Sequence, residues 1–133
     1  MKKSILLVFL VGILFSCSNI EEETSVAPQT LVGTWKLKEI LFDPGDGSGT
    51  FQSVNSTKTL IFDTNGNVTS NGSICDMSIE TNASSIGTYS EANSSINPSN
   101  CPNLTLNYEL NANTLVIIYP YIELCKAKYI RVQ

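Results

Sequence analysis

The stretch LVGTWKLKEI, residues 31–40, begins a region of short β-prone segments that extends to the end of the chain. Clusters of Gly, Asn, Asp, Ser and Pro separate these segments, and none has the 3.6-residue apolar repeat of a helix. We therefore predict one all-β domain over residues 31–133. Its eight strand candidates lie near residues 33–42, 57–63, 67–74, 84–90, 94–98, 103–110, 114–119 and 126–132.

Turn signals and alternation predict how these strands pair. FDTNGNV, residues 62–68, places Asn65-Gly66 between two β-prone runs, and this dipeptide favours a tight hairpin because both residues tolerate positive φ. In residues 103–110, apolar side chains alternate with polar ones, so one face should be buried and the other wet. Eight short antiparallel strands in about a hundred residues favour a small, closed up-and-down barrel, which leaves no exposed edge.

Four stretches carry a resemblance to a known family. Gly33-Thr34-Trp35 at the head of the first strand resembles the Gly-x-Trp signature of lipocalins. Together with the stretches below, which run in the same order, it resembles the lipocalin-like domain of Bacteroidetes lipoproteins, a calycin-type β-barrel. The matching stretches are LVGTWKL, DPGDGSGTF, KTLIFDTNGNVTSNGS and CKAKYI.

The resemblance implies how one end of the barrel is closed. In that fold Trp35 plugs the closed end beside Gly33, and a basic residue of the last strand packs over it, a position that Arg131 would occupy. A guanidinium over an indole contributes roughly 0.5–2 kcal/mol, depending on burial. The alternative is that Trp35 is merely a large core residue and Arg131 a solvated charge.

The first 16 residues have the layout of a secretory leader. Lys2 and Lys3 precede an apolar run that is too short to span a membrane, and Leu14-Phe15-Ser16-Cys17 resembles the lipobox of bacterial lipoproteins. We expect a signal peptide over residues 1–16 and acylation of Cys17, which would anchor the protein to a membrane. The alternative is cleavage at another small residue, which would leave Cys17 as an ordinary thiol.

Residues 17–30 read as a polar tether that cannot bury a core. The cluster Glu21-Glu22-Glu23 resembles the signal that exports Bacteroidetes lipoproteins to the outer face of the outer membrane. We expect an outer-membrane location, with surface exposure favoured over a periplasm-facing barrel. The alternative is that the glutamates only keep the tether extended by mutual repulsion.

Composition excludes several classes of function. The chain has 8 basic and 12 acidic residues, which argues against a nucleic-acid partner. It has no histidine, the commonest general base and metal ligand, so we expect neither an enzyme nor a cofactor. DPGDGSG, residues 43–49, could wrap a calcium ion but lacks the carboxylate spacing of an EF-hand, so we expect a flexible loop and no metal.

Strand directions place three cysteines at one end of the barrel. Cys75, Cys101 and Cys125 follow the third strand or precede the sixth and the eighth, so all three should lie at the open end, where the lipocalin resemblance makes the connection 43–56 a lid. We predict a Cys101–Cys125 disulfide, because these residues head strands only two apart and the turn PYIEL can close the gap. A zinc-binding or catalytic trio is the alternative.

These features predict a lipid-anchored, non-enzymatic β-barrel that binds a small apolar or amphipathic molecule at its open end. Such barrels either hold one ligand or are filled by their own side chains. Leu106, Tyr108, Ala127 and Tyr129 would line the interior in both cases, as ligand contacts or as core. The alternative function is an envelope interaction module, which docks a protein partner of unknown identity or inhibits a hydrolase.

Overall fold

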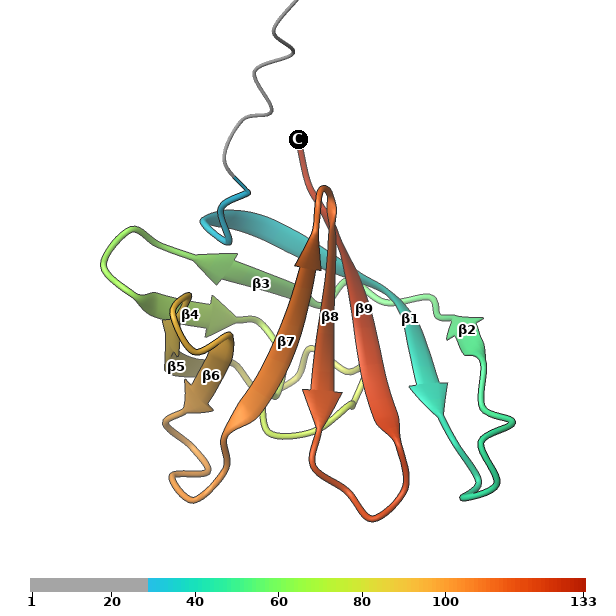
Figure 1. Cartoon of the computed structure of the whole chain (residues 1–133). Helices are drawn as coiled ribbons and strands as arrows, with labels where there is room; N and C mark the ends of the chain where they lie inside the picture. Colours follow the sequence, from blue (N-terminus) through green and yellow to red (C-terminus); the bar gives the residue numbers. More distant parts are fainter. Residues whose placement is uncertain (1–28) are drawn as a thin grey trace, which may run out of the picture.

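Nine strands form a single antiparallel sheet in the computed structural model, which describes residues 29–133 (Figure 1). The predicted all-β class is confirmed. Within the described residues, no helix is long and apolar enough to cross a membrane. The strands are β1 (Gly33–Phe42), β2 (Phe51–Ser53), β3 (Thr59–Phe62), β4 (Asn67–Ser70), β5 (Ser85–Ser90), β6 (Ser95–Pro98), β7 (Leu106–Asn111), β8 (Thr114–Tyr119) and β9 (Cys125–Arg131).

The sheet closes into a barrel because β1 pairs with β9 from Trp35↔Arg131 to Phe42↔Cys125. On its other side β1 pairs with β3 along its first half and with β2 along its second half. The strands β2 and β3 are therefore two halves of one barrel strand, and the predicted eight-stranded up-and-down barrel is confirmed. The predicted lid over residues 43–56 is wrong, because β2 belongs to the barrel wall.

A β-bulge at Lys38 bends the first strand. The register with β9 passes from Leu37↔Tyr129 to Glu39↔Lys128, so β1 has one residue more than its partner. Figure 1 shows the resulting curvature of β1. Before the bulge, Trp35 and Leu37 face the core, whereas after it Ile40 packs against the core. Leu41 is therefore on the other face of the strand, where it is buried outside the main core cluster. The first half of β1 can thus pair with β3 and its second half with β2 while the strand curves around the barrel.

Alternation along the strands fills the barrel interior. Val68 on β4, Ile96 on β6 and Ile117 on β8 point inward and are fully or almost fully buried, as the period of two requires. The buried core cluster consists of Leu31, Trp35, Leu37, Leu60, Phe62, Val68, Ile74, Ile96, Leu106, Tyr108, Leu115, Ile117, Tyr119, Cys125, Ala127 and Tyr129.

Turn chemistry fixes the predicted hairpin between β3 and β4. Gly66 has a φ of 83°, which glycine adopts without strain. The Asp63 carboxylate accepts the backbone N–H groups of Asn65 and Asn67 at 2.8 and 2.9 Å. These hydrogen bonds hold the pKa of Asp63 below its ordinary value, the Asn67 side-chain amide contributing most. The hairpin prediction at Asn65-Gly66 is confirmed.

The short and the long connections between strands lie at opposite ends of the barrel. Three tight connections, after β3, β5 and β7, lie at the end that holds Trp35, which we call the closed end. The longer connections after β4, β6 and β8 lie at the opposite, open end. Most of the irregular backbone therefore gathers at the open end.

Candidate functional site

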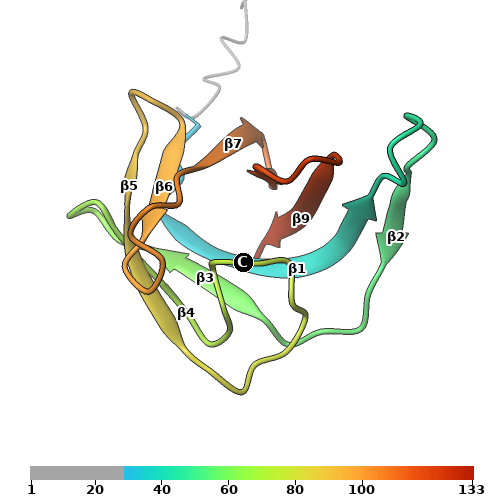
Figure 2. The ribbon, with the colours of Figure 1, turned by 90° about the horizontal axis from the view of Figure 1, so that it is seen from below.

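The connection between β4 and β5, residues 71–84, crosses the open end of the barrel (Figure 2). We call it the plug segment. Ile74 is 1% exposed and belongs to the core cluster, and Met77 and Ile79 pack against that cluster. Gly72 permits the close approach of its two ends, because a Cβ there would lie 2.4 Å from the Glu80 carbonyl oxygen. The strand predicted over 67–74 is shorter in the structure: β4 ends at Ser70, where the plug segment begins.

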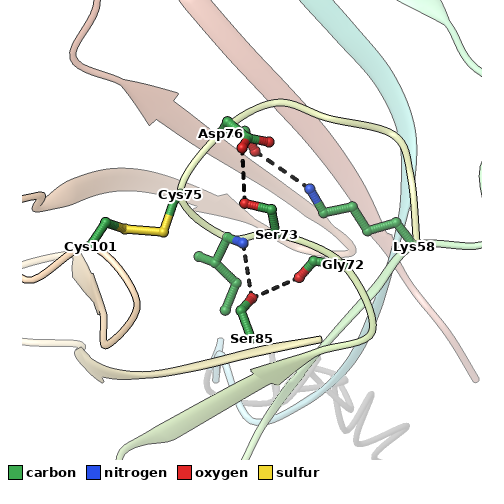
Figure 3. The surroundings of a disulfide bond; sticks show 8 residues. Lys58, Gly72, Ser73, Cys75, Asp76, Ser85 and Cys101 are labelled. Carbon is green, nitrogen blue, oxygen red and sulfur yellow. Dashed lines mark hydrogen bonds between the residues drawn. A yellow bond between two sulfur atoms is a disulfide. The ribbon is translucent and has the colours of Figure 1, made fainter. Parts of the chain in front are cut away.

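Contacts to the barrel wall hold the plug segment in place (Figure 3). The Ser85 hydroxyl donates to the Gly72 carbonyl at 2.7 Å and accepts from the Ile74 N–H at 3.0 Å. On the opposite side, the Ser56 hydroxyl donates to the Ile79 carbonyl at 2.6 Å. These are side-chain contacts to a loop, since the plug segment pairs with no strand.

A disulfide between Cys75 and Cys101 ties the plug segment to the β6–β7 connection, with a Cα separation of 6.1 Å (Figure 3). The predicted Cys101–Cys125 pairing is wrong. Cys125 is a free thiol that faces the core from β9, where burial raises its pKa. The predicted gathering of Cys75, Cys101 and Cys125 at the open end follows from the strand directions and is confirmed.

Lys58 lies inside the barrel beneath the plug segment, on the same strand face as Leu60 and Phe62. Its side chain is 0% exposed. Its ammonium group donates to the Ser78 carbonyl at 2.7 Å and is 3.5 Å from the Asp76 carbonyl (Figure 3). Loss of hydration lowers its pKa to about 8, although the Asp76 carboxylate opposes this shift.

Two tyrosines complete this polar region. Tyr119 on β8 and Tyr129 on β9 are 2% and 1% exposed. The Tyr119 hydroxyl has no hydrogen-bond partner among the described residues. Burial raises its pKa well above the ordinary value, and the neighbouring Tyr129 adds to the rise. The negative charge of Asp76 favours the protonated forms of Lys58 and of both tyrosines and so raises the pKa of each.

The four predicted ligand-lining residues all face the interior, and all are buried in the core. Leu106, Ala127 and Tyr129 are fully or almost fully enclosed. Tyr108 borders an open cavity of about 380 Å³ that Glu91 and Glu109 also line. Tyr108 therefore lies on the closed-end side, and only Tyr129 belongs to the polar group beneath the plug segment.

The predicted closed-end trio is confirmed. The Arg131 guanidinium lies 4.2 Å from the centre of the Trp35 ring and donates to the Val32 carbonyl at 2.8 Å. It also donates to the Thr30 carbonyl. The Trp35 indole N–H donates to the Leu31 carbonyl at 2.8 Å, which satisfies its buried polar atom.

Hydrogen bonds from backbone N–H groups to one carboxylate hold the loop at residues 43–49 in place. The Asp43 carboxylate accepts the N–H groups of Gly45, Gly47 and Gly49, and these bonds hold its pKa below the ordinary value, Gly49 contributing most. Within residues 29–133, no three His, Cys, Asp or Glu side chains gather as a metal site would require. The loop leads directly into β2 along the edge of the wall.

Exposed apolar side chains gather at the open end, on the end of β1 and on the β8–β9 connection. We call this group the apolar rim. Tyr121 stacks on Tyr119 with ring centres 6.1 Å apart, which joins the rim to the interior. The Ile122 side chain is fully exposed at the tip of its connection. The apolar rim consists of Phe42, Tyr121, Ile122 and Leu124.

Sequence reasoning missed Lys58 and the plug segment. The even-numbered residues 58, 60 and 62 share the inward face of a strand, so alternation could have indicated a buried lysine. No comparable pattern marks residues 71–84, because their course depends on contacts with distant strands.

Comparison with known proteins agrees with this architecture. The family model of the lipocalin-like domain matches residues 31–117, which is well over half of the chain. A search of curated proteins found no match, and a search of solved structures found none either. The matched region includes the Gly33-Trp35 signature, the plug segment and both bonded cysteines. The chain therefore belongs to the lipocalin-like domain family.

Proposed function

We propose that this protein is a non-enzymatic binding protein that takes a small apolar or amphipathic molecule at the open end of its barrel. A lipocalin-like barrel is consistent with small-ligand binding in general. The observation that carries the proposal is that a loop, and not packed strands, covers this end of an aliphatic and aromatic core. A loop can move aside at lower cost than a strand ladder.

The surface is hollowed beside the plug segment. A shallow cavity of about 310 Å³, lined by residues 101–104, lies next to the disulfide. Met77 and Ile79 in the plug segment are only partly buried. A ligand that entered here would replace these side chains against the core and would gain roughly 25 cal/mol for each Å² of apolar surface that it buries.

The binding test is to purify the full chain from its native membrane and determine the density inside the barrel. In parallel, the protein is titrated with fatty acids, retinoids and haem, with Trp35 fluorescence as the readout. We expect one class of probe to bind at one site per barrel. A side-chain-filled barrel that binds none of these probes would overturn the proposal.

We also propose that acyl chains on Cys17 anchor the protein to the outer membrane, with the barrel on the cell surface. The leader and Cys17 lie outside the described residues, as does the tether up to residue 28, so the sequence alone supports this part. Metabolic labelling with an alkyne-bearing fatty acid should mark the wild type and leave Cys17→Ser unmarked. Protease added to intact cells should remove the barrel, whereas a protected barrel would indicate the periplasmic face.

A second candidate function is that of an envelope interaction module. The exposed side chains of the apolar rim favour it, because contiguous apolar surface often marks a protein contact. If this is correct, Ile122→Asp should abolish recovery of one stoichiometric partner from solubilised outer membranes. Ile86→Asp, at an exposed position on β5 away from the rim, is the matched control.

A further inference from the structure

The cavity of about 380 Å³ at the closed end lies where β7 runs beyond its pairing with β6. These strands pair only at Ser95↔Asn107 and Ile96↔Leu106, whereas β7 continues to Asn111. The volume is within the range of about 300–1,000 Å³ that is usual for small-molecule sites. The cavity is lined by Gln29, Glu91, Ser94, Tyr108, Glu109 and Leu110, and it is distinct from the open end.

Tyr108 brings an unused hydroxyl group to this cavity. The residue is only 7% exposed, yet its hydroxyl takes part in no hydrogen bond with the described residues. Loss of hydration raises the pKa of Tyr108, and the negative charge of Glu91 adds to the rise. A polar group that is buried without a partner is unfavourable. Because Tyr108 lines the cavity, a ligand there supplies the missing partner.

Glu91, the first residue of the β5–β6 connection, has one carboxylate oxygen without a partner. Its Oε1 accepts the Leu31 N–H at 3.2 Å, and its Oε2 accepts no hydrogen bond from the described residues. The two ion pairs of the described residues involve Glu109 and Glu39, and neither includes Glu91. Residues 17–28 contain no lysine or arginine, so they supply no cation for this carboxylate either.

Glu109 is a second carboxylate of the lining, and it is only loosely paired. Its Oε1 lies 3.7 Å from the Lys126 ammonium nitrogen, and its side chain is 62% exposed. Two carboxylates beside one cavity attract a cation. Within residues 29–133, no three His, Cys, Asp or Glu side chains gather as a metal site would require, so an organic cation fits better. The partly buried Leu110 offers an apolar contact for an alkyl chain.

We propose that this closed-end cavity binds a small aliphatic amine, whose ammonium group donates to the Glu91 carboxylate and to the Tyr108 hydroxyl oxygen while its methylene groups contact Leu110. An ammonium group has three donors and no acceptor, so it satisfies both oxygens at once. The Glu109 carboxylate adds attraction at longer range. Since the cavity and the open end lie at opposite ends of the barrel, this inference is independent of the proposed function.

The test is equilibrium dialysis of the full chain in vesicles of neutral phosphatidylcholine against radiolabelled 1,5-diaminopentane, at pH 7 and low ionic strength. Neutral lipid keeps the amine from binding to the vesicle surface. The matched probe is 1,5-pentanediol, which has the same chain length and no charge. We expect the diamine to bind at one site per chain, at least about tenfold more tightly than the diol. Added salt should weaken binding of the diamine only, because it screens the carboxylates.

Four variants assign the binding to these side chains. Glu91→Gln should raise the dissociation constant of the diamine about fivefold, the size expected for loss of an ion pair that is partly open to solvent. Tyr108→Phe should raise it several-fold and leave that of the diol unchanged. Lys126→Met should lower it, because Glu109 loses a competing cation. Glu80→Gln, the same change of charge at an exposed position of the plug segment, is the control and should behave as wild type.

Equal affinity for diamine and diol, or binding of neither, would overturn the inference. A dissociation constant that Glu91→Gln and Glu80→Gln change alike would also overturn it, because the amine would then respond to net charge alone. Recovery of the Cys75–Cys101 peptide under non-reducing conditions verifies that each variant has folded. If one variant does not fold, Lys126→Met decides, since a folding defect does not produce tighter binding. Each of these failures leaves the proposed function at the open end standing.

Discussion

Gly33 has a φ of 135°, and a Cβ at this position would lie 2.7 Å from an Arg131 guanidinium nitrogen. Gly33→Ala should therefore lower the free energy of unfolding by about 2 kcal/mol, through backbone strain and displacement of the guanidinium from Trp35. Denaturant titration followed by the fluorescence of Trp35, the single tryptophan of the chain, measures this loss.

Gly47→Ala separates the two causes. Gly47 has a φ of 77°, and a Cβ there would meet no atom within 4 Å. Strain alone should lower the free energy of unfolding by about 1 kcal/mol in this variant, with the Trp35 emission unchanged. Equal losses and identical emission in both variants would show that the contact with Arg131 is unimportant.

The buried Lys58 makes stability depend on pH. Its pKa falls from 10.5 in the unfolded chain to about 8 in the barrel, so between these values the unfolded chain binds more protons. The free energy of unfolding should therefore rise from pH 8 toward pH 10, by up to about 3 kcal/mol. The gain ends near pH 10, because the raised pKa values of Tyr119 and Tyr129 favour the unfolded chain once tyrosines ionise there.

Denaturant titrations at pH 7, 8, 9 and 9.5 measure this slope. Lys58→Met should remove the rise, whereas Lys38→Met should retain it because Lys38 is exposed. A wild-type stability that is flat from pH 8 to pH 9.5 would contradict the assignment of the lowered pKa to Lys58.

At the scale of elements, the disulfide connects two loops that share no strand pairing. Cys75 and Cys101 are separated by 26 residues, and in the chain-entropy model a bond across such a loop contributes about 3.5 kcal/mol. The double variant Cys75→Ser, Cys101→Ser should lose an amount of this order. Calorimetry or denaturant titration with and without reductant measures it.

Cys125→Ala is the matched control for the disulfide. Its buried thiol takes no part in the bond, so this variant should lose the same stability on reduction as wild type. Peptide mapping should recover the Cys75–Cys101 peptide from both proteins. A bridged peptide that contains Cys125, or a wild type that reductant does not destabilise, would contradict the assignment.

At the scale of the whole molecule, the seam between β6 and β7 is the weakest part of the closed sheet. These strands pair at two positions, whereas β1 and β9 pair at seven. Amide hydrogens in peptides from residues 95–107 should therefore exchange faster than those in peptides from residues 114–131. Hydrogen exchange followed by mass spectrometry tests this, and uniform protection around the barrel would contradict it.

The amino-acid sequence by itself determined the features that depend on local rules. The Asn65-Gly66 turn, the alternation in β7 and the Gly33–Trp35 signature each occupy a few neighbouring residues, and the predicted barrel and its closed end followed from them. Strand directions alternate in an up-and-down barrel, so the placement of three cysteines at one end also followed from sequence order.

Only the tertiary structure decided what covers the open end. Whether Cys101 bonds to Cys75 or to Cys125 depends on the path of residues 71–84 and on the inward register of β9, and neither is encoded in spacing along the chain. The enclosure of Lys58 depends on the same path, because the carbonyls that accept its hydrogen bonds lie 18 and 20 residues away. Contacts between segments so distant form only when the barrel closes, and a local pattern cannot specify them.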